Sequence, residues 1–193
     1  LINKKNLNID IESHFNFDFS KKNILITAHR RENFGEGILN ICQAIQVLSK
    51  KYKDFNFIYP VHLNPNIKNT VEKKISNLHN VFLIEPLNYL EFVYIMSKSF
   101  IILTDSGGVQ EEAPSLNIPV LVMRDTTERP EAVDFNKVKL VGTDTEKIIN
   151  EVDNLIKNKT YYDSFTQNVN PYGDGRAAEK IVEFLKNRKN VSK

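Results

Sequence analysis

The sequence predicts an α/β fold whose core is a doubly wound, mainly parallel, Rossmann-like sheet of six strands. Short apolar runs rich in β-branched and aromatic residues alternate with segments whose apolar residues recur at helical spacing. Polar residues follow five of these runs directly, where such a sheet binds its ligands. With 193 residues, the chain can bury one substantial core, which favours one domain over two very small ones.

The expected strands occupy residues 23–28, 56–61, 81–84, 100–104, 119–123 and 138–141. The first expected helix, 37–52, shows the helical period most clearly, because Ile38, Ile41, Ile45 and Leu48 fall on one face. Right-handed crossovers between parallel strands place helices on both faces of the sheet. The remaining helices are expected at 66–78, 89–98, 108–116, 144–158, 160–167 and 175–188.

The opening segment, residues 1–20, is polar and rich in asparagine, and it lacks the pattern of a signal peptide. We expect it to be a connector to a preceding part, and residues 21–193 to form the domain. The turn 170–177 is rich in glycine and leads into the last helix, so helix capping explains it.

Charge and composition exclude several classes of function. The 26 basic and 24 acidic residues give a net charge of +2, so no overall field favours nucleic acid or an anionic membrane. The longest apolar runs are of strand length, which predicts no transmembrane segment. The single cysteine, Cys42, lies in the apolar pattern of a helix and allows no disulfide framework, so a cytoplasmic setting is expected. We expect no metal and no redox cofactor, since neither ligand spacing nor a three-glycine motif is present.

The segment 104–112 is the most informative motif. Ser106, Gly107 and Gly108 follow an apolar strand and open a helix, whose first backbone N–H groups and positive dipole end suit a phosphate. Glu112 lies about one turn after Gly108, within reach of a ribose diol beside that phosphate. The motif therefore predicts a nucleotide ligand, and a tight helix start without a ligand is the alternative.

Charged residues follow other strands at the same rim. His29, Arg30 and Arg31 follow the first strand, where they could neutralise a diphosphate with Glu32 orienting an arginine, or all four could form only a loop ion-pair cluster. His62 follows the second strand and is explained equally well by turn capping. Arg129 lies in the loop 126–131 as a candidate phosphate or sugar contact, with a charged surface turn as the alternative.

Four of these segments, residues 28–33, 61–66, 104–114 and 122–132, closely resemble the bacterial non-hydrolysing UDP-N-acetylglucosamine 2-epimerases. The match runs in order from about residue 23 to residue 185. It covers only the carboxyl-terminal half of that family's members, which have two Rossmann-like domains facing each other across a cleft, as in GT-B glycosyltransferases.

The resemblance implies interconversion of UDP-N-acetylglucosamine and UDP-N-acetylmannosamine by elimination and re-addition of UDP, for surface polysaccharide synthesis. The family's acid and base carboxylates lie in the amino-terminal domain, so we expect this half to bind UDP and UDP-N-acetylhexosamine and to be inactive alone. The expected protein partner is an amino-terminal epimerase domain, in the same or a separate chain. The alternatives are a solitary UDP-sugar-binding module without turnover and the donor domain of a GT-B glycosyltransferase.

The resemblance also implies a role for individual residues. His29 would contact the departing phosphate and Arg129 the substrate, while an activating second UDP-N-acetylglucosamine would contact Arg30, Glu32 and His62. An isolated half would expose its cleft rim, so self-association is expected. The implied UDP-binding residues are Leu87, Phe92, Ser106, Gly107, Gly108 and Glu112.

Overall fold

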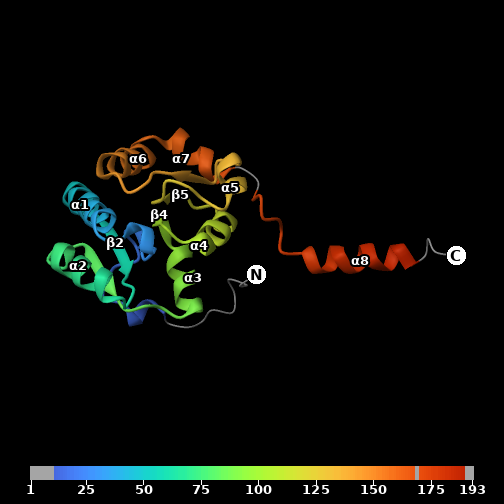
Figure 1. Cartoon of the computed structure of the whole chain (residues 1–193), viewed down its shortest axis with the longest axis horizontal. Coiled ribbons are helices and arrows are strands. Elements are labelled where there is room, and N and C mark those ends of the chain that lie inside the picture. The colour runs from blue at the N-terminus through green and yellow to red at the C-terminus, as the bar shows by residue number, and fades with distance from the viewer. Residues whose placement is uncertain (1–10, 168–169, 190–193) are drawn as a thin grey trace.

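The computed structural model describes residues 11–167 and 170–189, and one sheet of six parallel strands lies at its centre (Figure 1). The strand order is β3-β2-β1-β4-β5-β6, which places β1 and β4 side by side. The predicted doubly wound parallel sheet is confirmed, and each strand starts and ends within one residue of its expected position. The strands are β1 (Lys22–Thr27), β2 (Phe55–Pro60), β3 (Val81–Ile84), β4 (Ser99–Thr104), β5 (Val120–Val122) and β6 (Val138–Leu140).

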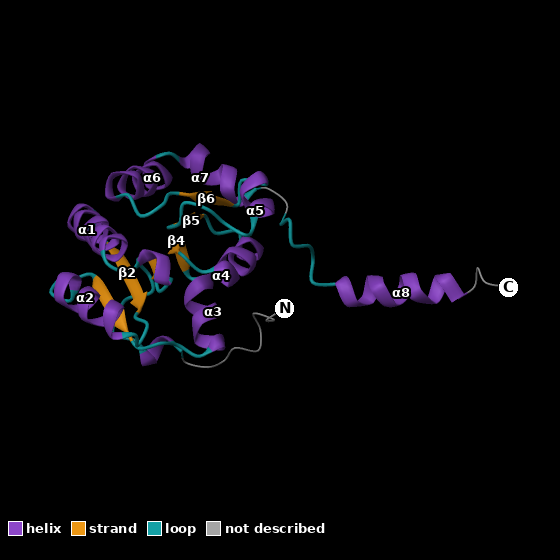
Figure 2. Cartoon of the chain, in the orientation of Figure 1, coloured by secondary structure: helices purple, strands orange, loops and turns teal. Residues whose placement is uncertain are grey.

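Figure 2 shows the helices arranged around the strands, and several of them start at recognisable sequence signals. Asn88 and Glu91 form a reciprocal capping box at α3, and Asp144 caps α6 through the backbone N–H of Lys147. The α-helices are α1 (Glu36–Lys51), α2 (Pro65–Ile75), α3 (Tyr89–Ser97), α4 (Gly107–Glu112), α5 (Pro130–Asp134), α6 (Thr145–Lys157), α7 (Lys159–Thr166) and α8 (Ala177–Lys189). Short 3-10 helices are η1 (Glu12–His14), η2 (Arg31–Asn33) and η3 (Ala113–Leu116).

Two differences from the expected helices have local causes. The single helix expected at 108–116 is α4 followed directly by η3, because Pro114 has no N–H to continue the α-helical ladder. The short helix α5 lies in the segment expected to be a loop, and Pro130 at its first turn supplies a preset φ angle.

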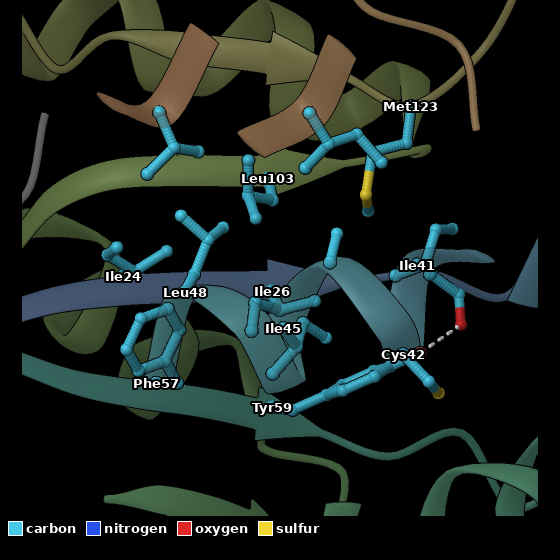
Figure 3. Packing of buried hydrophobic residues seen from close by; sticks show 14 of the residues in the cluster. Ile24, Ile26, Ile41, Cys42, Ile45, Leu48, Phe57, Tyr59, Leu103 and Met123 are labelled. Atoms are coloured by element: carbon cyan, nitrogen blue, oxygen red, sulfur yellow. Dashed lines mark hydrogen bonds between the residues drawn. The ribbon is translucent and has the colours of Figure 1, made fainter. Parts of the chain in front are cut away.

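The sheet separates two hydrophobic cores. Alternating residues of β1 face opposite sides, with Ile24 and Ile26 packed on the side of α1, α2, α6 and α7, and Leu25 on the side of α3, α4 and α5. Figure 3 shows the first core, in which α1 packs over β1, β2 and β4. The predicted burial of Cys42 is confirmed there, and burial raises the pKa of its thiol to about 12.

The first described residues pack on the domain, whereas the last helix projects away from it (Figure 1). Residues 11–20 of the expected connector pack on the domain, with Ile11 and Phe17 buried and Asn56 donating to the Asp18 carbonyl oxygen. Residues 1–10 lie outside the described part, so the connector boundary stays a prediction. At the other end, α8 projects away from the sheet with exposed apolar side chains (Figure 1). Within the described ranges, every helix is too short or too polar to span a bilayer.

Candidate functional site

A pocket of about 280 Å³ opens at the carboxyl ends of the central strands. Because β1 leads into α1 on one face and β4 leads into α4 on the other, their loops diverge and leave space between them. Seven of the eleven predicted site residues line this pocket: His29, His62, Leu87, Phe92, Ser106, Gly108 and Glu112. It is also lined by Thr27, Pro60, Pro86, Tyr89 and Val109.

The Ser-Gly-Gly turn forms one wall of the pocket. Ser106 is the N-cap of α4 in an extended conformation, and its side chain makes no capping hydrogen bond, so the helix's first N–H groups receive no acceptor from it. A Cβ at Gly107 would lie 3.4 Å from Nη2 of Arg30, so the guanidinium of Arg30 is next to the turn. These donors and this charge make the wall suitable for an anion.

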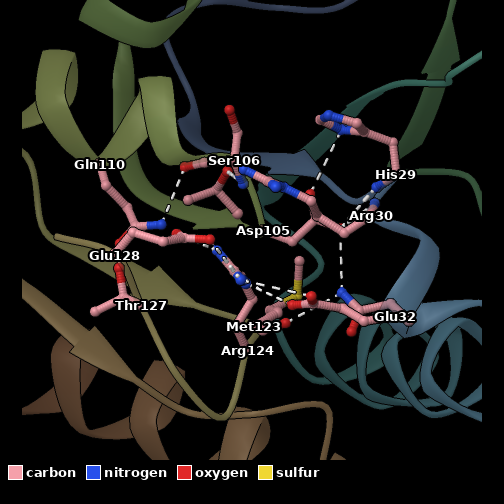
Figure 4. A network of polar contacts seen from close by, with 12 residues as sticks. His29, Arg30, Glu32, Asp105, Ser106, Gln110, Met123, Arg124, Thr127 and Glu128 are labelled. Atoms are coloured by element: carbon pink, nitrogen blue, oxygen red, sulfur yellow. Dashed lines mark hydrogen bonds and ion pairs between the residues drawn. The ribbon is translucent and has the colours of Figure 1, made fainter.

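Buried polar groups connect the carboxyl ends of β4 and β1, next to this turn. The hydroxyls of Thr27 and Thr104 lie 2.6 Å apart, and Oγ1 of Thr104 accepts from the Ser106 backbone N–H at 3.0 Å. The carboxylate of Asp105, fully buried, accepts from the backbone N–H groups of His29 and Arg30 at 2.8 and 2.7 Å through its Oδ2 (Figure 4). The loop that carries His29 and Arg30 is therefore attached to the start of the Ser-Gly-Gly turn.

Asn33, the last residue of η2, connects the same loops through its side chain. Its side-chain amide donates to Oδ2 of Asp105 at 3.1 Å and to the carbonyl oxygen of Met123 at 3.2 Å. One buried amide thus links the segments that follow β1, β4 and β5. The sequence reasoning assigned no role to Asn33.

The opposite wall of the pocket is mainly apolar. Leu87, which precedes α3, and Phe92 within α3 line it and also pack against the second core. Tyr89 lies beside Glu112, whose negative charge raises the pKa of the Tyr89 phenol. The pocket therefore has an apolar side next to a carboxylate and an anion-binding side at the Ser-Gly-Gly turn.

Two imidazole rings line the pocket. His29 and His62 stack with ring centroids 5.5 Å apart and an interplanar angle of 9°. Nδ1 of His29 lies 3.4 Å from Oδ1 of Asp105. The structure therefore brings His62 into the same pocket as His29, although the two come from different loops.

Glu32 and Arg129 do not line the pocket but lie in ion pairs beside it. Arg124, 6% exposed, pairs with Glu32 through Nε and with both oxygens of Glu128 at 2.7 and 3.0 Å (Figure 4). The Arg124 guanidinium holds the pKa of Glu128 down at about 2. Arg129 pairs with Glu111, which raises the pKa of its guanidinium.

Several residues that line the pocket or lie beside it carried no individual prediction. Thr27 and Thr104 had a usable signal, because Thr104 ends a predicted strand, Thr27 lies one residue before the end of another, and β1 and β4 are neighbours in this topology. Tyr89 and Arg124 had none, because their importance depends on which loops meet in space. Among the residues that the structure describes, no three His, Cys, Asp or Glu side chains are grouped to hold a metal ion.

Comparisons with known proteins identify the family of the chain. The family model described as UDP-N-acetylglucosamine 2-epimerase matches residues 1–186. A UDP-N-acetylglucosamine 2-epimerase of Neisseria meningitidis is 59% identical over 170 residues, which cover 88% of this chain and 46% of that protein. The chain thus spans about half the length of the curated relatives it matches.

Solved structures give the same picture. The UDP-GlcNAc 2-epimerase from Neisseria meningitidis bound to UDP-GlcNAc is similar to this chain with a TM-score of 0.86 and 56% identity, over 92% of this chain and 48% of that one. The carboxyl-terminal domain of a glycosyl transferase group 1 family protein from Francisella tularensis shares the fold, with a TM-score of 0.62 at 20% identity over 78% of this chain and 82% of that one. The predicted Rossmann-like fold, like that of a GT-B carboxyl-terminal domain, is confirmed. Since the family model covers nearly the whole sequence, the chain belongs to the UDP-N-acetylglucosamine 2-epimerase family.

Proposed function

We propose that this chain is the UDP-binding half of a UDP-N-acetylglucosamine 2-epimerase, which converts UDP-N-acetylglucosamine to UDP-N-acetylmannosamine by eliminating and re-adding UDP. The observation that carries the proposal is the joint placement of Phe92, Ser106, Gly108, Glu112 and His29 around one pocket. The structure of a 56% identical relative bound to UDP-GlcNAc supports the same ligand class.

The chemistry of the pocket walls gives the orientation of the ligand. The uracil ring packs on Phe92 and meets the backbone of Leu87, on the side of the pocket where an aromatic base gains from apolar contact. Glu112 accepts hydrogen bonds from the ribose hydroxyls. The diphosphate then reaches the N–H groups at Ser106–Gly108, with Arg30 beside them.

This orientation assigns the leaving-group chemistry to the present chain. His29 contacts the distal phosphate, on which negative charge develops as the bond to the sugar breaks. Arg129 contacts the substrate after exchanging its ion pair with Glu111 for the ligand. Proton removal at carbon 2 needs acid and base groups that we assign to an amino-terminal domain, in the same chain or a separate one.

We propose that an activating UDP-N-acetylglucosamine molecule uses the adjacent rim. Arg30 and His62 contact it directly, since His62 lines the pocket and Arg30 lies at its edge. Glu32 contacts the activating molecule as well, and its ion pair with Arg124 holds its carboxylate in a fixed orientation. A cytoplasmic setting fits a chain whose single cysteine is buried.

Calorimetry with UDP tests the binding proposal. Glu112→Gln keeps the side-chain size but removes the charge, and we expect UDP affinity to fall about tenfold to a hundredfold. Glu146→Gln, on the exposed surface of α6, is the matched control and should bind like the unchanged protein. Gly107→Val should also weaken binding, because the two methyl groups of valine extend beyond a Cβ that would already contact Arg30 at 3.4 Å. Equal affinity in Glu112→Gln and Glu146→Gln would reject the pocket assignment.

An epimerase assay with and without a supplied amino-terminal domain tests whether the proton chemistry requires that domain. We expect turnover only with both halves. Turnover by this chain alone would contradict the assignment of the proton chemistry, and UDP binding without turnover in either case would favour a solitary binding module.

A further inference from the structure

The two oxygens of the Asp105 carboxylate have unequal surroundings. Oδ2 accepts three hydrogen bonds, from the backbone N–H groups of His29 and Arg30 and from the amide of Asn33. Oδ1 is buried and has no hydrogen-bond partner among the described residues, although Nδ1 of His29 lies 3.4 Å away. A buried carboxylate oxygen without a donor is costly, so this arrangement favours a proton on Nδ1 of His29.

We propose that Asp105 is a positioning residue that keeps the proton of neutral His29 on Nδ1 and thereby couples nucleotide binding to proton uptake at Nε2. This role rests on the proposed function, because the diphosphate is the anion that Nε2 meets. A neutral imidazole with its proton on Nδ1 presents a lone pair at Nε2, which repels a phosphate oxygen. Binding therefore brings one proton from solvent to Nε2, and the resulting imidazolium donates to Asp105 and to the phosphate together.

The neighbours of His29 leave Asp105 as its ion-pairing partner. His62, from the loop after β2, stacks on the ring face and makes no hydrogen bond to it. Among the described residues, Asp105 is the one carboxylate within ion-pair distance of the His29 ring. The other titratable or charged groups around this part of the pocket are Arg30 on the same loop, Tyr89 on α3 and Glu112 on α4.

The variant Asp105→Asn tests whether Asp105 positions the His29 proton while keeping the hydrogen bonds that hold the loop. The Asn carbonyl oxygen can replace Oδ2 as the acceptor for the three N–H donors, and its NH₂ group then faces Nδ1 of His29. Because that amide donates to Nδ1, the imidazole proton moves to Nε2. A neutral ring that already carries its proton on Nε2 can bind phosphate without taking up another.

Nitrogen NMR of the imidazole tautomers, without any ligand, is the first test. We expect the Nδ1–H form for His29 in the unchanged protein and the Nε2–H form in Asp105→Asn, with the signal identified by its loss in His29→Gln. His62→Gln removes the stacked ring but no carboxylate, so it should keep the Nδ1–H form. An Nε2–H form in the unchanged protein would overturn the proposal, even if Asp105→Asn failed to fold.

Calorimetry with UDP in buffers of different ionisation enthalpy is the second test. At about pH 8, where an unperturbed imidazole is neutral, we expect uptake of about one proton per UDP in the unchanged protein and much less in Asp105→Asn and His29→Gln. Equal uptake in all three would overturn the proposal. Failure of the unchanged protein to bind UDP would instead reject the proposed function, while the tautomer result would still decide the role of Asp105.

Discussion

Asn33 offers the sharpest test of how the site is held together. The residue is 5% exposed, and its side-chain amide is the shared donor for the Asp105 carboxylate and the Met123 carbonyl. Truncation to alanine leaves both acceptors short of one donor in a buried setting. A hydrogen bond to a charged group contributes about 1.5–3 kcal/mol and one to a neutral carbonyl about 1 kcal/mol, so we expect Asn33→Ala to reduce the free energy of unfolding by about 3 kcal/mol.

Urea unfolding followed by circular dichroism measures this change, and thermal unfolding should show a melting temperature lower by about 6–12 °C for a domain of this size. Asn69→Ala is the matched control, because Asn69 is exposed on α2 and alanine favours the helix. A loss below about 1 kcal/mol in Asn33→Ala would refute the reasoning, since it would mean that the two acceptors do not depend on this amide.

Three further outcomes follow from the structure. The thiol of Cys42 should react with an aromatic disulfide reagent only when the protein unfolds, because burial raises its pKa to about 12; reaction at the rate of a free thiol would contradict its burial. The pKa of Glu128 is lowered from an ordinary 4.5 to about 2 by Arg124, so its contribution to stability is present above pH 4.5 and is lost as the pH falls towards 2. The pH dependence of unfolding should therefore become shallower over this range in Glu128→Gln, and an unchanged slope would count against the pairing. Finally, Ile181→Lys combined with Phe184→Glu should reduce self-association in sedimentation velocity, because both apolar side chains are exposed on α8. If the unchanged protein is a monomer at all concentrations, the expected self-association is wrong.

The strands were predictable because their apolar residues are buried on both faces, and a buried parallel strand reads as a short continuous apolar run. The gathering of His29, Ser106 and Glu112 at one rim also followed from topology, since the carboxyl ends of parallel strands lie at the same edge. The residue-level roles assigned to them stay predictions.

The connections between the loops were not predictable from the sequence. Arg124 and Glu32 are 92 positions apart, and their pairing depends on β1, β4 and β5 lying side by side with particular loop shapes. Asn33 lies in the segment 28–33 that resembles the epimerases, but nothing in its neighbours indicates that its amide reaches Asp105 and Met123. Local sequence signals report which residues start helices and strands, whereas these contacts join segments distant along the chain.

The separation of the two cores by the sheet has a consequence for how the site can change. The wall that carries His29 leads into α1, which packs in one core, while the wall that carries Ser106 leads into α4, which packs in the other. A volume change beneath α1 should therefore act first on the loop that carries His29, and one beneath α4 on the Ser-Gly-Gly turn. Because the buried Asp105 carboxylate joins these two loops by hydrogen bonds, substitutions far from the pocket should change its width only as far as those bonds allow.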